Sequence, residues 1–176
     1  MNKKLLTLCM VLMTLGATGA INAENEKPFV IPELRNWQGG EGSLTIDADT
    51  RVLYTDATLA VAAEELANDY GLLFGKSMKT KAVKSTPKTP AGAIVFNLTS
   101  DQELGEEGYS IEIGETVIIN AQTAAGAYWS TRTLLQILEQ TNGMHIPKGM
   151  IRDWPDYAIR GYMIDCGRKY VPLEYL

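Results

Sequence analysis

The sequence has few of the residues on which common catalytic centres depend. Its 176 residues include one histidine, His145, and two cysteines, Cys9 and Cys166. With a single histidine we expect neither a zinc site nor a Ser-His triad in this chain, and we expect no cofactor. Cys9 lies in an apolar leader, so Cys166 alone would remain after export. A lone thiol cannot form an internal disulfide, and we interpret Cys166 as a buried structural residue.

Basic clusters and long apolar runs are also scarce. Lys and Arg number 16 against 21 Asp and Glu, a net charge of −5, which argues against nucleic acid or an anionic membrane as partner. The apolar run Leu5–Leu15 is shorter than the roughly 20 residues that span a bilayer. Because it follows Lys3 and Lys4 and precedes small residues, it predicts a signal peptide over 1–23.

We expect cleavage of this leader after Ala20 or Ala23, and no membrane insertion once it is removed. The mature protein would be exported, in the periplasm, on the cell surface or secreted. The Asn-Lys-Lys start is typical of a bacterial leader.

The sequence as a whole has the composition of a globular domain, with 45% hydrophobic residues. Alternating or continuous apolar residues predict strands, and apolar residues at helical spacing predict two helices. The strands fall at 43–47, 51–54, 93–98, 109–113, 117–119 and 145–151, and the helices at about 59–74 and 124–138. We predict an α+β fold, a small sheet with hairpins and two helices packed on one face.

Several local features accompany this pattern. The segment 24–42 is interpreted as a lead-in before a domain over 43–155, and the lysine-rich segment 76–90 as a surface loop. Gly114 and Glu115 predict a two-residue hairpin turn with positive φ at the glycine. Tyr128 and Trp129 are assigned to the core.

The last part of the chain, 156–176, does not belong to this layer. Residues 157–165 predict one more, largely apolar strand, 167–170 a loop, and 172–176 the first turn of a helix. That order is the first half of a βα unit.

Two stretches together resemble the family 20 glycoside hydrolases, the exported β-N-acetylhexosaminidases. The first is Glu107–Ala121, continued by Gly126–Trp129 and Thr133–Leu138, which is similar to the hairpin and second helix of the family's non-catalytic domain. The second is Ile151–Tyr157 followed by Arg160–Arg168. It resembles the join to the catalytic (β/α)₈ barrel and its first strand.

The resemblance implies hydrolysis of terminal β-linked N-acetylglucosamine or N-acetylgalactosamine by a retaining, substrate-assisted mechanism. The substrate's 2-acetamido oxygen attacks the anomeric carbon, an Asp orients the acetamido group, and a neighbouring Glu acts as acid and base. The family places this pair on the fourth barrel strand. A barrel needs about 250 residues, so we expect the catalytic pair beyond residue 176 and no catalytic residue in this chain, which alone would be inactive.

The resemblance also supplies candidate binding residues. Arg160 matches an arginine that hydrogen-bonds sugar hydroxyls, and the other interpretation is a structural ion pair with Asp165 or Asp156. Asp165 and Arg168 are interpreted as ion-pair partners that shape the pocket, with sugar contact as the alternative. Lys169 stands where many members carry His.

A second hypothesis belongs to a different class of protein. The chain could be a free-standing exported module that binds a carbohydrate or another partner. A third, an accessory domain before a different hydrolase barrel, is disfavoured by the pattern from Arg160 to Arg168.

Overall fold

The computed structural model describes residues 24–47, 49–84 and 90–164, together with Gly167, Tyr170 and Pro172. The predicted signal peptide 1–23 lies outside the described residues. Within them the elements are β1 (Asn36–Thr45), β2 (Arg51–Tyr54), η1 (Ala57–Leu59), α2 (Ala60–Phe74), β3 (Lys79–Ala82), β4 (Ile94–Leu98), η2 (Gln102–Leu104), β5 (Tyr109–Ile113), β6 (Val117–Ala121), α3 (Ala124–Glu139) and β7 (His145–Asp153).

The strands form one mixed sheet of seven in the order β1-β7-β5-β6-β4-β2-β3. β3, β2, β4 and β6 run parallel to one another, whereas β5 pairs antiparallel with both β6 and β7, and β1 antiparallel with β7. The chain passes from β6 through α3 to β7, with β5 lying between those two strands in the sheet. This split βαβ arrangement carries the chain onto the half of the sheet that ends in β1.

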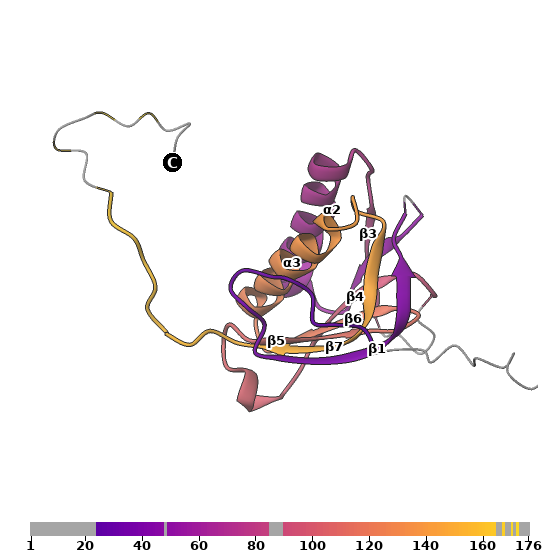
Figure 1. Cartoon of the computed structure of the whole chain (residues 1–176), viewed down its shortest axis with the longest axis horizontal. Helices are drawn as coiled ribbons and strands as arrows, with labels where there is room; N and C mark the ends of the chain where they lie inside the picture. Colours follow the sequence, from indigo (N-terminus) through magenta and orange to yellow (C-terminus); the bar gives the residue numbers. More distant parts are fainter. Residues whose placement is uncertain are drawn as a thin grey trace, which may run out of the picture.

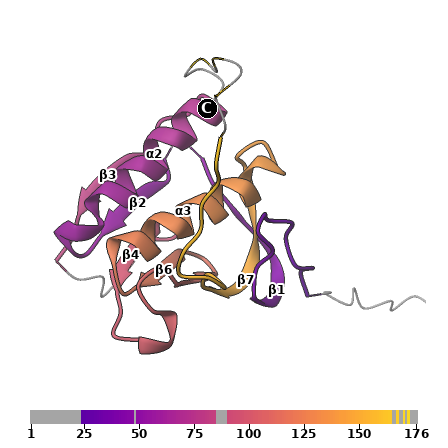
Figure 2. The ribbon, with the colours of Figure 1, turned by 90° about the vertical axis from the view of Figure 1, so that its left-hand side faces the viewer.

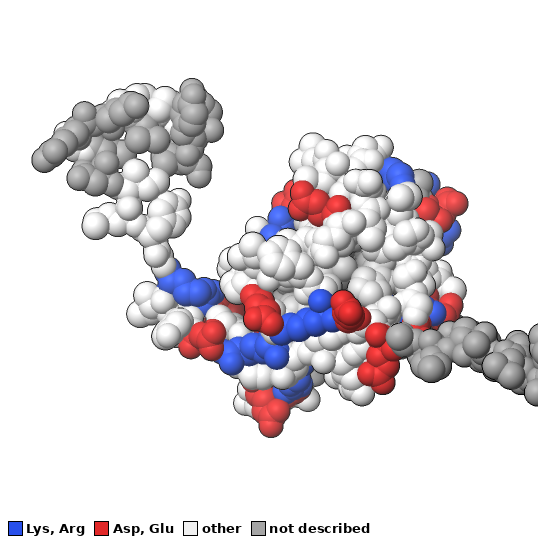
Figure 3. Space-filling model, in the orientation of Figure 1, with Lys and Arg blue, Asp and Glu red and all other residues white. Residues whose placement is uncertain are grey.

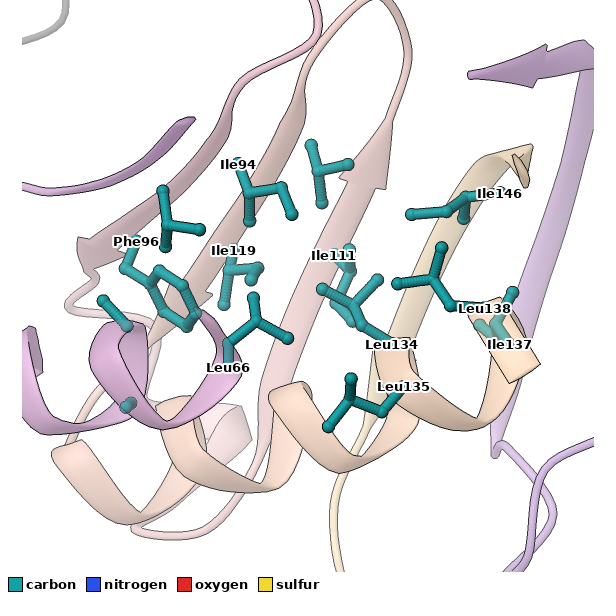
Figure 4. Close-up of a cluster of buried hydrophobic side chains, with 14 of the residues drawn as sticks. Leu66, Ile94, Phe96, Ile111, Ile119, Leu134, Leu135, Ile137, Leu138 and Ile146 are labelled. Carbon is teal, nitrogen blue, oxygen red and sulfur yellow. The ribbon is translucent and has the colours of Figure 1, made fainter. Parts of the chain in front are cut away.

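Both helices cover the same face of the sheet (Figures 1 and 2). Each has an apolar stripe at helical spacing, which must be buried against another layer. Leu66 of α2 and Leu134 of α3 are fully buried against sheet residues such as Ile111 (Figure 4). The helix–sheet layer therefore holds the main core, as the α+β prediction requires, and that prediction is confirmed.

Local sequence signals explain where α3 begins and how closely it approaches the sheet. Thr123 caps the helix, accepting hydrogen bonds from the backbone N–H groups of Ala125 and Gly126 at 3.1 and 3.3 Å. A Cβ on Gly126 would lie 2.4 Å from the carbonyl oxygen of Gly108. Only glycine allows this close packing of the helix start against the approach to β5.

The first strand differs from its prediction. It was expected at 43–47 but spans Asn36–Thr45, within the segment interpreted as a lead-in. A register shift between Gly39 and Ser43 interrupts the alternation, and so the sequence pattern hides the strand's first half. Asn25 holds this bulge, donating to the carbonyls of Gly42 and Lys148 at 2.6 and 2.9 Å.

The lysine-rich segment 76–90 is not wholly a loop. Residues Lys79–Ala82 form β3, which pairs in parallel with β2 at the edge of the sheet. Three of its four residues are polar, because an edge strand needs backbone pairing more than an apolar face, and edge lysines oppose further strand addition. Periodicity therefore gave no signal for it.

The turn of the β5–β6 hairpin also differs from its prediction. Ile113 pairs with Val117, so three residues, 114–116, connect the strands. Thr116 belongs to the turn: its carbonyl accepts from the Gly114 N–H at 3.0 Å and its hydroxyl donates to the Pro90 carbonyl at 3.1 Å. Gly114 is not among the glycines with positive φ.

The strand predicted at 157–165 is not formed in its described part, 157–164, which follows β7 as an extended and largely exposed segment. A strand needs a neighbouring strand for its N–H and C=O groups, and nothing in the described chain pairs with this one.

No helix in the described ranges is long and apolar enough to cross a bilayer.

Candidate functional site

The segment that follows β7, residues 154–164, is called the connector below. Its start is fixed to the domain by Arg35, which comes just before β1. The Arg35 Nε donates to the Trp154 carbonyl at 2.7 Å, and its guanidinium pairs with Asp156 and lies 4.8 Å from the centroid of the Trp154 ring. The direction in which the chain leaves the sheet is thus set by contacts with the N-terminal segment.

Arg160, the candidate sugar-binding residue, is the second attachment point of the connector. Its Nη2 donates to both carboxylate oxygens of Glu107, at 3.0 and 2.9 Å, and its Nη1 donates to the Tyr157 carbonyl at 2.6 Å. The guanidinium also lies 5.9 Å from the ring centroid of Trp129 on α3, whose indole N–H donates to Glu107 at 3.4 Å. Glu107 therefore joins the connector to the helix layer.

A cleft of about 330 Å³ lies between the segment 30–35, α3 and the connector. Its volume is at the lower end of the range for small-ligand pockets. Its walls combine aromatic rings with arginine and carboxylate groups, among them Arg35, Glu107, Trp129, Asp153, Trp154 and Arg160.

Tyr109 at the start of β5 contributes a buried polar group to this cleft. Its hydroxyl donates to Asp153 at 2.9 Å and contacts the Thr133 hydroxyl. Burial, reinforced by the charge of Asp153, raises the pKa of Tyr109 well above its ordinary value. The phenol thus stays protonated at any physiological pH and acts as a hydrogen-bond donor that ties β5 to the end of β7.

The carboxylates that line the cleft already have partners. Glu107 pairs with Arg160, Asp156 with Arg35, and Asp153 accepts from Tyr109 and from the Arg35 backbone N–H. Glu33 pairs with Lys27, which lowers the pKa of that carboxyl. These contacts hold chain segments together, and they do not leave two carboxyl groups converging on an open space as a glycosidase requires.

The sequence-predicted site residues have three different outcomes. Arg160 is in the cleft wall, but the Asp156 suggested as its structural partner pairs with Arg35. Asp165 and Arg168 lie outside the described residues. Trp129 and Tyr128, assigned to the core, are partly exposed on the outer side of α3, because the buried stripe of that helix is centred on Leu134 and Leu138.

The role of Glu107 could not be predicted, because no sequence signal pairs it with Arg160, a residue 53 positions away. Among the described residues, no group of three or more His, Cys, Asp or Glu could hold a metal ion.

The fold defines a small α+β domain whose last strand runs into a connector that ion pairs and hydrogen bonds hold against the domain. Residues 27–154 match the model of glycosyl hydrolase family 20, domain 2. The match covers most of the chain and ends where the connector begins. This chain belongs to that family and contains its domain 2.

Individual relatives agree with this assignment. The chain is 29% identical over 146 residues to a lacto-N-biosidase of Bifidobacterium bifidum, covering 82% of this chain and 13% of the relative. It is 32% identical over 145 residues to a β-hexosaminidase of Porphyromonas gingivalis, covering 74% of this chain and 18% of the relative. The chain thus spans less than a fifth of the length of either.

Solved structures share the fold. The family 20 exo-β-N-acetylglucosaminidase of Vibrio harveyi, solved in complex with N-acetylglucosamine, superposes on 88% of this chain and 23% of its own length, with a TM-score of 0.70 and 23% identity. The β-N-acetylhexosaminidase of Streptomyces coelicolor superposes on 77% of this chain and 28% of its own, with a TM-score of 0.59 and 23% identity. At this identity the likeness establishes the fold alone.

Proposed function

We propose that this chain is the N-terminal part of an exported β-N-acetylhexosaminidase that removes terminal β-linked N-acetylglucosamine or N-acetylgalactosamine from glycans. One observation carries the proposal. The domain 2 match ends at Trp154, and the chain then continues through the arginine and aspartate pattern from Arg160 to Arg168. In this proposal residues 156–176 begin the catalytic barrel, and the 24–155 layer is its accessory domain.

The chemistry would be retaining and substrate-assisted. The catalytic Asp and Glu would lie beyond residue 176, in agreement with a cleft whose carboxylates are all engaged in ion pairs or hydrogen bonds. Arg160 would donate to sugar hydroxyls, a role that suits its fixed fork of donors. It would then have to exchange the Glu107 carboxylate for the sugar when its strand joins the barrel.

The test is to express the longer protein that contains this chain and assay it on an aryl N-acetyl-β-glucosaminide. We expect hydrolysis, with the β-anomer of the sugar released first, as detected by NMR. Absence of turnover, or release of the α-anomer first, would contradict the proposal.

We also propose that the protein is exported, with its leader removed by cleavage after Ala20 or Ala23. Asn25 supports a cleavage site N-terminal to it, because its side-chain amide donates to the carbonyls of Gly42 and Lys148 in the bulge of β1 and its backbone carbonyl accepts from the Trp37 indole N–H. Intact mass of the secreted or periplasmic form should correspond to a start at Ile21 or Glu24. A mature form that begins beyond Asn25 would contradict this.

The cleft itself favours a second candidate function, a carbohydrate-binding module. Trp129 and Trp154 line the cleft with aromatic rings on which a sugar could stack. Titration of the 176-residue chain with N-acetylglucosamine oligomers, followed by tryptophan fluorescence, separates the two. A saturable change favours the module, and none is expected for an accessory domain.

A further inference from the structure

The positive charges of the domain fall into two groups. Outside residues 51–84, each Lys and Arg of the described chain pairs with an Asp or Glu, and these cations are Lys27, Arg35, Arg132, Lys148, Arg152 and Arg160. Figure 3 shows side chains of opposite sign side by side in a band across the lower part of the molecule. The other five cations of the described chain make no ion pair within it. These five, called the basic edge below, are Arg51, Lys76, Lys79, Lys81 and Lys84.

The basic edge follows the strand that ends the sheet. β3 is last in the strand order, and its pairing with β2 sets Lys79 opposite Arg51 and Lys81 opposite Leu53. Opposed residues of a parallel pair point to the same side of a sheet, and successive residues point to opposite sides. Val52 belongs to the core that the helices cover. Arg51, Lys79 and Lys81 therefore lie on the side of the sheet that the helices leave open.

Two lysines extend the basic edge beyond both ends of β3. Lys76 follows the cap of α2, and Lys84 follows Val83, whose N–H donates to the Tyr54 carbonyl at 2.9 Å and so keeps the chain beside β2. Residues 76–84 include four lysines and no acidic residue. Lys76 is half-buried and the other four cations are exposed. The result is a row of accessible positive charge along one edge of the domain.

These charges lie close enough to repel one another. Lys79 and Lys81 are about 6.6 Å apart along the strand, and Arg51 lies about 4.8 Å across from Lys79. The two acidic residues just before Arg51 make no ion pair in the described chain, and the Asp47 carboxylate instead accepts from backbone N–H groups of its own turn at 2.9 and 3.1 Å. A bound anion would relieve the repulsion.

Protection of the sheet edge does not account for all five cations. A lysine on an edge strand opposes the addition of another strand, and Lys79 and Lys81 supply that protection. Arg51 lies on the neighbouring strand, and Lys76 and Lys84 lie outside β3. A cluster of unpaired cations on a chain of net charge −5 is instead typical of a surface that binds an anionic polymer.

The side chains indicate which kind of anion fits. Four of the five are lysines, whose ammonium groups act as point charges. Arginine, whose planar fork of donors matches a single carboxylate, is the residue expected where one carboxylate must be held in a fixed orientation. Lysines about 6.6 Å apart suit a chain that carries strong negative charges at short intervals.

We propose that the basic edge binds a sulfated polysaccharide, which lies along β3. The inference rests on the proposed function, since an exported glycosidase meets polysaccharides. The connector leaves from β7, which is five positions from β3 in the sheet order, or about 24 Å at about 4.8 Å per strand. The basic edge would therefore hold the polymer near the enzyme without presenting a bond for cleavage, and it would raise the local concentration of chain ends.

The test is a calorimetric titration of the longer protein with chondroitin sulfate, and with chondroitin that lacks sulfate. We compare Lys79→Gln/Lys81→Gln with Lys76→Gln/Lys84→Gln, a second pair that leaves β3 unchanged. The matched control is Lys27→Gln/Lys148→Gln, which removes the same net charge from lysines that already have carboxylate partners.

We expect chondroitin sulfate to bind saturably and the unsulfated chain to bind much more weakly. Each basic-edge pair should weaken the binding of chondroitin sulfate by about tenfold, and the control pair by less than about twofold. Because exposed charges are screened by salt, binding should be lost at about 0.5 M NaCl. Absence of binding, equal affinity for the unsulfated chain, or equal effects of all three pairs would overturn the inference.

Other anionic partners are tested with the same variants. Tighter binding of a single-stranded oligonucleotide, or of vesicles containing phosphatidylglycerol, that both basic-edge pairs weaken would assign the surface to nucleic acid or membrane and overturn the inference. So would self-association of the parent protein that both basic-edge pairs abolish and chondroitin sulfate does not compete with.

Turnover of the uncharged aryl glycoside is measured separately, and all three pairs should retain the parent's rate. Binding of chondroitin sulfate through the basic edge by a protein without turnover would refute the proposed function and leave this site standing. Turnover by a protein that does not bind chondroitin sulfate would refute the site and leave the proposed function standing.

Discussion

At the scale of single residues, the ion pairs on the side of the sheet that the helices do not cover allow a direct measurement of a carboxyl pKa. Arg152 on β7 hydrogen-bonds Asp101, and this contact holds the pKa of the Asp101 carboxyl below its ordinary value. A lowered pKa stabilises the folded state above the unfolded pKa of about 3.9, and this contribution is lost as the pH falls through the folded value.

Arg152→Gln should therefore raise the pKa of Asp101 and shift acid unfolding to higher pH. The Glu103 backbone N–H still donates to Asp101, so the pKa should return only part of the way. NMR titration of the carboxyl carbon measures it. Lys148→Gln, which removes a separate pair with Glu115, is the control and should leave Asp101 unchanged. An unaltered Asp101 pKa in Arg152→Gln would refute the assigned cause.

Arg160 supports a prediction about the longer protein. If its guanidinium donates to the sugar, Arg160→Gln should lower kcat/KM by about 10- to 150-fold, the equivalent of about 1.5–3 kcal/mol for a charged hydrogen bond. Glu107→Gln, which removes its partner in the present structure, should change kcat/KM less than about twofold. Steady-state kinetics on the aryl glycoside decides this. A larger effect for Glu107→Gln than for Arg160→Gln would show that the pair itself matters.

The residues that sequence reasoning misplaced share a physical cause. Trp129 is apolar and helical, and hydropathy alone assigns it to a core, but it faces away from the stripe centred on Leu134. Glu107 acquires its role only through a contact 53 residues distant. Both errors concern packing partners, which a local pattern does not contain.

At the scale of secondary-structure elements, the contact between α3 and the approach to β5 is set by two glycines. An alanine at Gly126 gains about 1 kcal/mol of helix propensity, but its Cβ would lie 2.4 Å from the backbone oxygen of Gly108. Backbone cannot move aside as a side chain can. An overpacked site usually costs about 1–3 kcal/mol, so after the gain in helix propensity Gly126→Ala should destabilise the domain by up to about 2 kcal/mol.

Urea unfolding followed by circular dichroism measures this change. Gly114→Ala is the matched control, since a Cβ there meets nothing within 4 Å and the residue does not have a left-handed φ. We expect it to stay within about 0.5 kcal/mol of the parent. Equal stability of the two variants would contradict the close approach described for α3.

The elements that the sequence predicts well are those with an apolar face of regular period. β4, the β5–β6 hairpin, α2, α3 and β7 all have one and were placed within a few residues. β3 is polar because it needs only backbone pairing at an edge, and the first half of β1 is interrupted by a bulge. Elements that are specified by backbone pairing alone have no regular hydropathy pattern, and so the sequence does not predict them.

At the scale of the whole molecule, the domain is built asymmetrically. The sheet presents ion pairs on one side, and the helices present apolar residues on the other, where the connector also leaves. The α+β class followed from the order and period of the elements, and the family resemblance followed from one stretch before the connector and one that runs through it. The arrangement of the cleft could not be predicted from the sequence, because it depends on the ion pairs of Arg35 and Arg160 that hold the connector against the domain.

The central proposal is that this layer supports a glycosidase without performing its chemistry. The most direct test is turnover by the 176-residue chain alone, at high enzyme concentration, on an aryl N-acetyl-β-glucosaminide that the longer protein hydrolyses. We expect no hydrolysis above the rate without enzyme. Turnover by the short chain comparable to that of the longer protein would place the catalytic carboxylates within residues 24–176 and contradict the proposal.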